Sequence, residues 1–219
     1  MCMENNIYCF WTGKNPMSRQ RLRCLDQLRE ISQCNVTLVT PEILSKYILH
    51  EHPLHPSFAY LSETHKADYL RTYFMRFHGG GYSDIKRTTN SWVESFEQLR
   101  KSDKWVIGYK EVNGGVAYSP LANSWRKLLG NGAYICKPNT QLVIEWYDEM
   151  VDLMDKKYDE LRKNPAKFPQ DRKELYCGKA HCYPIEWNEM LGRIFHKILY
   201  KYKNKSLNTL PICVFHSYR

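Results

Sequence analysis

The chain alternates between short apolar runs, which predict buried strands, and stretches with apolar residues three or four positions apart, which predict helices. The apolar run Ile7–Trp11 predicts a first strand. Ser18–Ser32 carries an apolar residue at every third position and predicts a helix with Ser18 as its N-cap. Asn35–Thr40 predicts a second strand, and Pro41 then begins a short helix.

The rest of the chain continues this alternation. Thr64–Phe77 predicts a helix that Gly79–Gly81 terminates, and Tyr82–Ile85 predicts a short strand. The other expected elements are helices at Ser91–Leu99, Pro138–Arg162 and Trp187–Tyr202 and strands at Trp105–Tyr109, Gly130–Cys136 and Pro211–Phe215. We therefore expect an α/β fold, with a central mixed, mostly parallel sheet flanked by helices. We expect one domain over residues 1–219, with a fragment of a longer protein as the open alternative.

Composition narrows the classes of function. Hydrophobic residues make up 43% of the chain and charged residues 25%, which is typical of a globular protein. The net charge of +9 favours a polyanion or a phosphorylated ligand. The basic residues are dispersed apart from the run Tyr200–Lys205, and no zinc-finger spacing accompanies them. We expect no nucleic acid as a partner, and a nucleic-acid-binding module stays as a rival hypothesis.

The beginning of the chain and its cysteines bear on location. Met1–Asn6 leads into only a short apolar run, which is not a signal peptide, so we expect a cytoplasmic protein. No run of about 18 apolar residues exists, so we expect no membrane span. The eight cysteines are then expected as free, buried thiols. The segment Cys177–Cys182 has the spacing of no common zinc site.

Two neighbouring segments carry the candidate chemistry. Asp68 and Arg71 are three apart in a predicted helix and share a face, where an exposed salt bridge is the ordinary interpretation. Three glycines follow, which allow a tight turn and a close approach to a ligand, and a short strand then leads to Asp84. Ligands of open α/β sheets bind beyond the carboxyl ends of strands. An acid there suits a Mg²⁺ or Mn²⁺ ion that bridges a diphosphate.

The same residues resemble a known family. Lys66, Asp68 and Arg71, followed by His78–Lys86 (HGGGYSDIK), are similar to the K-x-D-x-x-R helix and the G-G-x-Y-x-D-x-D segment of small GT-A glycosyltransferases. That family includes capsular-polysaccharide, mannosyl and galactosyl transferases. The resemblance implies a GT-A-like fold and a hexosyl-type glycosyltransferase.

Three further segments extend the resemblance over the chain. Ile7–Gly13 resembles the opening strand of the family, Gly130–Ala133 the segment that faces the donor sugar, and Phe215–Tyr218 the closing segment. The overall likeness is greatest to the small glycosyltransferase domain of large chlorella viruses. It implies a UDP-sugar donor, a glycan or glycoprotein acceptor, a monomer and, for a viral protein, the host cytoplasm.

One position departs from the pattern. Lys86 stands where the family has the second aspartate of D-x-D, and a protonated lysine is no metal ligand. We favour a retained but weaker Mn²⁺ or Mg²⁺ site at Asp84, with His216 as a second ligand. The alternative is that Lys86 offsets the phosphate charge itself. His216 is as readily a surface residue.

The resemblance also implies roles for single residues. Asp68 would accept hydrogen bonds from donor-sugar hydroxyls, Arg71 would orient Asp68 or contact the donor, and Asp84 would bind the metal and the ribose. Phe10, Trp11 and Thr12 are expected at the uracil and ribose, and Lys14, Arg19, Lys86, His216, Ser217 and Arg219 near the diphosphate. Catalysis would then consist mainly of positioning and of stabilising the leaving group.

The stereochemical course depends on late-chain acids. Glu186 and Asp171 are the candidates for a base in an inverting enzyme. The resembling families retain configuration, so we favour retention, with Glu186 stabilising a cationic transition state. Glu186 as a helix cap is an equal alternative. A nucleotide-sugar-binding domain without activity and a phosphoryl-transfer enzyme complete the rivals, although no P-loop segment is present.

Overall fold

A computed structural model describes residues 4–175, 181–216 and 218 of the chain. These residues form a central β-sheet with helices around it. Within these residues the sheet has six strands in the order β2-β1-β3-β5-β4-β6. Their bounds are β1 (Asn6–Phe10), β2 (Asn35–Val39), β3 (Gly80–Ser83), β4 (Val106–Lys110), β5 (Leu129–Cys136) and β6 (Ser206–Leu207).

The strand directions confirm the expected mixed, mostly parallel sheet. β1 pairs in parallel with both β2 and β3, and β6 pairs in parallel with β4. β5 runs antiparallel to both of its neighbours, β3 and β4. Five of the six described strands therefore point the same way, so their carboxyl ends share one edge of the sheet with the beginning of β5.

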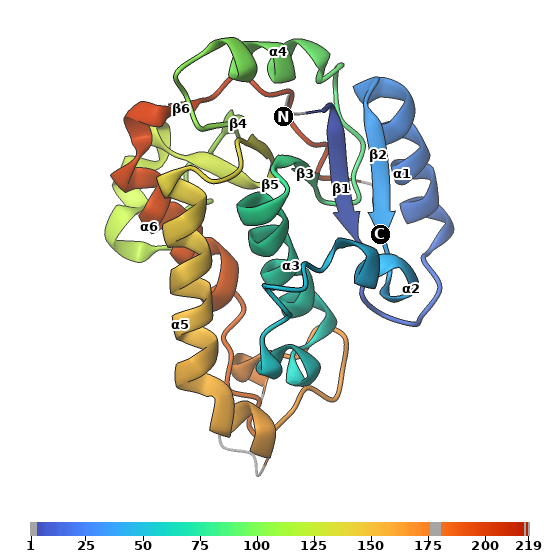
Figure 1. Cartoon of the computed structure of the whole chain (residues 1–219), viewed down its shortest axis with the longest axis vertical. Helices are drawn as coiled ribbons and strands as arrows, with labels where there is room; N and C mark the ends of the chain where they lie inside the picture. The colour runs from blue at the N-terminus through green and yellow to red at the C-terminus, as the bar shows by residue number, and fades with distance from the viewer. Residues whose placement is uncertain (1–3, 176–180, 217, 219) are drawn as a thin grey trace.

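Helices cover both faces of the sheet. Along β1, Tyr8 and Phe10 point to one face and Ile7 and Cys9 to the other, as the two-residue period of a strand requires. The first face packs against α3 (Glu63–Phe77), α5 (Gln141–Lys163) and α6 (Ile194–Lys201), and the second against α1 (Arg19–Ser32) and α4 (Val93–Lys101). The short helix α2 (Pro41–Leu44) follows β2 (Figure 1).

Helix α3 lies in the middle of the molecule. Figure 1 shows it beside α5, and both helices contribute to the core on the Tyr8 face of the sheet. The sequence predicts a single inner face of Ala67, Leu70, Phe74 and Phe77. In the structure almost every residue from Asp68 to Met75 is buried, because α5 covers the side of α3 that turns away from the sheet.

Local sequence signals explain several element ends. The Ser18 side chain accepts a hydrogen bond from the Arg21 amide and caps α1 as predicted, and Pro41 stands in the first turn of α2. Leu22, in contrast, is 47% exposed although it was expected on the inner face of α1. A strict three-residue step drifts by about 60° per step around a helix of 3.6 residues per turn, so the inner face runs through Cys24, Leu25 and Leu28.

The end of the chain differs from the prediction. Pro211–Phe215 does not form a strand: Cys213 makes an isolated bridge with Thr88, and β6, which the pattern did not predict, pairs with β4. The predicted helix Trp187–Tyr202 begins instead with a π-helical turn at Glu189–Arg193, and α6 follows it. No helix among the described residues has the length and apolar character needed to cross a bilayer.

Candidate functional site

The carboxyl ends of β1 and β3 and the beginning of β5 meet at one edge of the sheet (Figure 1). Asp84 is the first residue beyond β3, and its amide donates to the Gly132 carbonyl of β5 at 2.8 Å. Trp11 is the first residue beyond β1, and its amide donates to the Val39 carbonyl of β2 at 3.0 Å. Asp84 and Trp11 therefore leave the sheet at the edge where ligands of such sheets bind.

Asp68 and Arg71 form a buried ion pair instead of an exposed helix pair. Arg71 Nη2 lies 2.9 Å from Asp68 Oδ1, and the two residues are only 7% and 3% exposed. Arg71 Nη1 also donates to the Asn131 carbonyl at 3.1 Å, and the guanidinium lies 4.3 Å from the centre of the Tyr82 ring. Arg71 thus connects α3 to β3 and β5 at the same edge of the sheet.

Burial changes the ionisation of this pair. It raises the pKa of the Asp68 carboxyl to about 6, although the Arg71 guanidinium opposes the shift. Burial acts to lower the pKa of Arg71, but Tyr82 and Asp68 outweigh it, so the pKa is raised and the guanidinium stays charged. Asp68 therefore titrates close to neutral pH, where the carboxyl changes from an acceptor to a donor of hydrogen bonds.

Asp84 has hydrogen bonds to both carboxylate oxygens. Oδ1 accepts from the Tyr82 hydroxyl at 2.6 Å, and Oδ2 accepts from Lys86 Nζ at 2.6 Å. Arg71 Nη2 lies 3.8 Å from Oδ1. Burial alone would raise the pKa of Asp84, but Lys86 and Arg71 hold it below its usual value, so the carboxylate stays ionised.

The last part of the chain lies against Lys86. Lys86 Nζ is 4.5 Å from the ring centre of Phe215 and 4.8 Å from that of Tyr218, within the range of cation–π contacts. The Val214 amide donates to the Arg87 carbonyl at 3.0 Å and holds this segment beside the chain that follows β3. The closing segment of the chain thus reaches the same edge of the sheet as Asp84.

The three residues expected at the uracil have different surroundings. Phe10 is 7% exposed and packs against Phe74 and Tyr82 at ring distances of 4.9 and 5.8 Å. Its ring belongs to the core, because the last residue of β1 still alternates into the sheet face, so we correct its expected role in stacking. Trp11 is partly exposed, and Thr12 Oγ1 donates to the Glu63 carbonyl at 2.8 Å.

A basic residue that the sequence did not single out completes this side of the site. The Arg21 guanidinium lies 5.7 Å from the Trp11 ring and 5.6 Å from the Tyr218 ring. Lys14 and Arg19, which the sequence did single out, are exposed. The beginning of α1 holds several basic residues, and the sequence does not show which of them faces Trp11, because that depends on how the helix is oriented.

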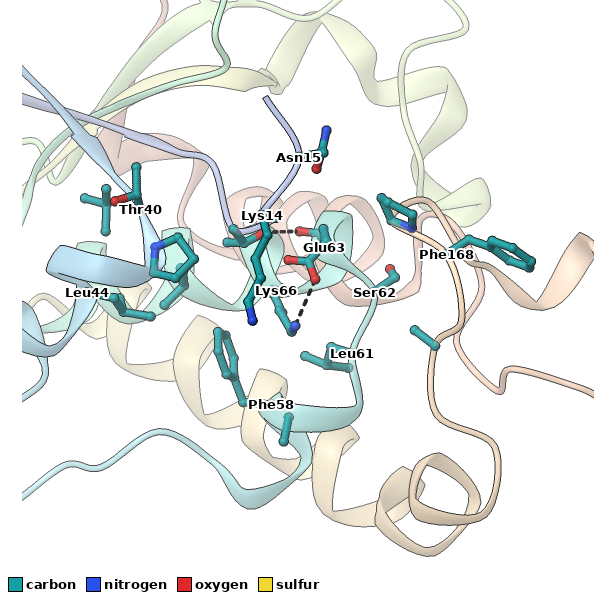
Figure 2. A pocket seen from close by; sticks show the side chains of 18 of the residues that line it. Lys14, Asn15, Thr40, Leu44, Phe58, Leu61, Ser62, Glu63, Lys66 and Phe168 are labelled. Carbon is teal, nitrogen blue, oxygen red and sulfur yellow. Dashed lines mark hydrogen bonds and ion pairs between the residues drawn. The ribbon is translucent and has the colours of Figure 1, made fainter. Parts of the chain in front are cut away.

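A cavity of about 570 Å³ opens beside these strand ends (Figure 2). It lies between the loop after β1, the end of β2 with α2, the beginning of α3 and the segment 166–169. Figure 2 shows the side chains of Lys14 and Lys66 reaching into the same part of the cavity near Phe58. Lys66 Nζ pairs with Glu63 Oε1 at 3.0 Å. The sequence did not indicate that Thr40, Phe58 and Phe168 would join this cavity.

The late-chain acids have structural contacts. The Glu186 carboxylate pairs with Arg193, and the Glu186 amide donates to the Glu189 side chain at 2.9 Å. Asn188, not Glu186, is the N-cap of the helical turn that follows. The Glu186 side chain thus contacts Arg193 and not the Asp68–Arg71–Asp84 cluster. Asp171 is fully buried and accepts from the Lys167 amide at 2.6 Å, which fixes its own loop.

The expected metal site has two candidate ligands in the chain, Asp84 and His216. His216 is exposed, and among the residues that the structure describes no three His, Cys, Asp or Glu side chains come together as a metal site. Ser217, Arg219 and Cys177 lie outside the described residues. Cys9, Cys136 and Cys213 are buried free thiols, as expected, and burial raises the pKa of each.

Comparison with known proteins shows a similarity in three-dimensional structure but none in sequence. By sequence, the chain matches no protein-family model and no curated protein. Its structure is similar to that of the PaToxG glycosyltransferase, with a TM-score of 0.52 and 14% sequence identity. The superposition covers 91% of this chain and 70% of that chain. An identity this low establishes the fold alone, and the chain therefore has the α/β fold of a glycosyltransferase.

Proposed function

We propose that this chain is a glycosyltransferase that takes its sugar from a nucleotide-sugar donor. The observation that carries the proposal is the buried Asp68–Arg71 pair, which adjoins Asp84 at the carboxyl edge of the sheet. A buried ion pair rarely adds net stability over apolar packing, so a core that keeps one beside a ligand-binding edge favours a binding role. The likeness in fold to a glycosyltransferase supports the same proposal.

The cavity suits the nucleoside half of the donor. Its volume of about 570 Å³ lies within the range of small-molecule sites, and it is lined by Thr12, which follows Trp11 at the end of β1. Lys14 and Lys66 supply positive charge there, which favours a phosphorylated ligand. The donor class that we propose is UDP-sugar, with Trp11 stacking on the base and the sugar directed toward Asp68.

The proposed chemistry consists of positioning and charge stabilisation. Asp68 would orient the donor sugar through its hydroxyls, and Arg71 would hold Asp68 ionised and in place. The bond from the anomeric carbon to the β-phosphate oxygen breaks with its electron pair on that oxygen, and nearby cations stabilise that charge. The acceptor hydroxyl oxygen bonds to the anomeric carbon, and its proton passes to the departing phosphate oxygen. We propose transfer of a hexosyl group with retention to a glycan or glycoprotein acceptor, by a single domain that works as a monomer.

A second candidate is a nucleotide-sugar-binding domain without turnover. The Lys86–Asp84 ion pair favours it, because both oxygens of Asp84 already accept hydrogen bonds within the protein. The two candidates agree on binding and differ only in whether the donor is consumed.

Thermal unfolding with UDP, GDP and CMP tests the donor class. A ligand at one hundred times its Kd stabilises by about 2.7 kcal/mol, which for a chain of this size raises Tm by about 5–10 °C. We expect this shift with UDP, and we expect its loss in Asp84→Asn. Asp26→Asn is the matched control, because the Asp26 side chain is 74% exposed on α1.

Release of UDP from UDP-glucose and UDP-galactose then distinguishes the two candidates. Steady release that disappears in Asp84→Asn but persists in Asp26→Asn supports the glycosyltransferase. Binding without release in the presence of a panel of sugar acceptors supports the binding domain. If none of the nucleotides changes Tm, the proposal is wrong.

A further inference from the structure

Lys86 lies inside the site as a paired, nearly buried cation. It is 7% exposed, its Nζ lies 2.6 Å from Asp84 Oδ2, and its amide donates to the Asp84 carbonyl at 2.6 Å. The rings of Phe215 and Tyr218 lie against the ammonium. Lysine is seldom buried to this degree without a partner, and here the partner is the strand-end carboxylate itself.

The surroundings of Asp84 do not fit a divalent cation. Mg²⁺ requires about six oxygen ligands in octahedral geometry, whereas both oxygens of Asp84 already accept from Tyr82 and Lys86. The described residues bring no second and third metal-binding side chain to this place. A cation on Oδ2 would also lie within about 5 Å of the Lys86 ammonium, where like charges repel strongly.

The net charge of the cluster of Asp68, Arg71, Asp84 and Lys86 also argues against a divalent cation. Asp68 and Asp84 contribute two negative charges and Arg71 and Lys86 two positive ones, so the cluster is neutral. With an aspartate at position 86 it would hold three negative charges and one positive one, and a divalent cation would restore neutrality. Replacing that aspartate by lysine therefore adds two positive charges, as binding of a divalent cation does.

We infer that Lys86 takes the place of a divalent cation, so that the diphosphate of the donor binds through the Lys86 ammonium without Mn²⁺ or Mg²⁺. The inference rests on the proposed nucleotide-sugar donor. Asp84, Phe215 and Tyr218 hold Nζ at the strand end, and the ammonium is a compact charge with three N–H donors. One of them is directed to Asp84 Oδ2, which leaves two for phosphate oxygens. The ammonium offsets the charge left on the β-phosphate when the bond to the sugar breaks.

Calorimetric titration of UDP in EDTA and in Mn²⁺ tests the inference on the wild-type protein. We expect the two Kd values to agree within about threefold, since the ammonium supplies the charge in both conditions. Lys86→Met should weaken UDP binding by at least about tenfold in both conditions, and Lys86→Arg should retain most of it because the charge remains. Lys101→Met is the matched control, because Lys101 is 78% exposed on α4, and it should bind as the wild type does.

Lys86→Asp gives the most specific result. It should bind UDP poorly in EDTA and recover binding in Mn²⁺, because the added carboxylate creates the charge that a cation neutralises. Two results overturn the inference but leave the proposed function standing. One is wild-type binding of UDP that requires Mn²⁺, and the other is Lys86→Met that binds UDP as tightly as the wild type. Failure of UDP, GDP and CMP to bind the wild type in either condition overturns the proposed function and the inference with it. The wild-type comparison does not depend on the folding of any variant.

Discussion

At the scale of single residues, Asp68 and Arg71 show how burial changes the meaning of a common sequence feature. An acid and an arginine three apart on a helix ordinarily form an exposed pair that contributes less than about 1 kcal/mol. Here the pair is buried at the sheet edge, and Arg71 also reaches the Asn131 carbonyl and the Tyr82 ring. The spacing of the two residues was visible in the sequence, but their burial was not.

The raised pKa of Asp68 predicts a pH dependence of donor binding. With a pKa of about 6, only about a tenth of Asp68 is ionised at pH 5, so a UDP-sugar should bind roughly tenfold more weakly than at pH 7.5. Calorimetric titration of UDP-glucose at both pH values measures this. Asp68→Asn should bind UDP-glucose weakly at both pH values. If the affinity of this variant changed with pH as much as that of the wild type, Asp68 would not be the group that causes the pH dependence.

Acid unfolding is not the expected cause of that weakening. The folded pKa of Asp68 is raised above its unfolded value of 3.8, so protonation between pH 6 and 4 stabilises the fold. Burial lowers the pKa of His65 from 6.5 to about 4, so this group costs stability as pH falls over nearly the same interval. The two contributions oppose each other, and a melting curve at pH 5 checks that the protein is folded.

At the scale of elements, Gly79, which joins α3 to β3, and Gly80 and Gly81, which begin β3, serve packing. Gly79 and Gly80 have φ of +66° and +88°, and the Gly79 amide donates to the Phe74 carbonyl at the end of α3. A Cβ on Gly80 would lie 2.9 Å from the Asn6 carbonyl oxygen of β1. The glycines therefore let β3 pair closely with β1 and set the position of Asp84.

Two glycine substitutions separate backbone strain from close packing. Gly80→Ala and Gly114→Ala both place alanine at a positive φ. At Gly114, where φ is +82°, a Cβ meets nothing within 4 Å, so Gly114→Ala should cost about 1–2 kcal/mol of unfolding free energy. Gly80→Ala should cost about 2 kcal/mol more, because the added methyl group also displaces β1. Urea unfolding measures both values, and equal costs would show that packing against Asn6 is unimportant.

At the scale of the whole molecule, residues from distant parts of the chain form the site. The loop after β1 supplies Trp11, α3 supplies Asp68 and Arg71, and the closing segment supplies Phe215 and Tyr218. Tyr218 also faces Arg21 at 5.6 Å, so the last described residue lies beside the first helix. The two ends of the chain meet at the site only in the folded molecule.

The double variant Phe215→Ala/Tyr218→Ala tests the closing segment. Removing both rings frees the Lys86 ammonium from two contacts, so UDP affinity should fall at least several-fold, by about 1 kcal/mol or more. Tm should change by only a few degrees, because Phe215 is 50% exposed. Ile212→Ala, at a 42% exposed position just before this segment, is the control. A large loss of Tm with unchanged affinity would contradict the prediction.

Sequence reasoning recovered most of the fold and part of the site. Short-range signals gave the element order, the Ser18 cap and the Pro41 helix start, because hydrophobic periods and backbone preferences depend on a few neighbouring residues. The same reasoning placed Asp84 at the end of a short strand, although that strand, predicted at Tyr82–Ile85, lies at Gly80–Ser83. It failed for Pro211–Phe215, where an apolar run indicates burial but does not determine whether a free sheet edge is available.

By itself, then, the sequence determined the alternating α/β order and the residue types that follow each strand. Only the tertiary structure determined that Asp68 and Arg71 are buried, that Phe10 belongs to the core and that Lys86 pairs with Asp84 beneath Phe215. The reason is physical: burial depends on which segments meet in space, and the segments that cover these residues, α5 over α3 and Phe215 over Lys86, lie far from them along the chain. Whether position 86 belongs to a metal site or replaces one is therefore a property of the assembled sheet edge.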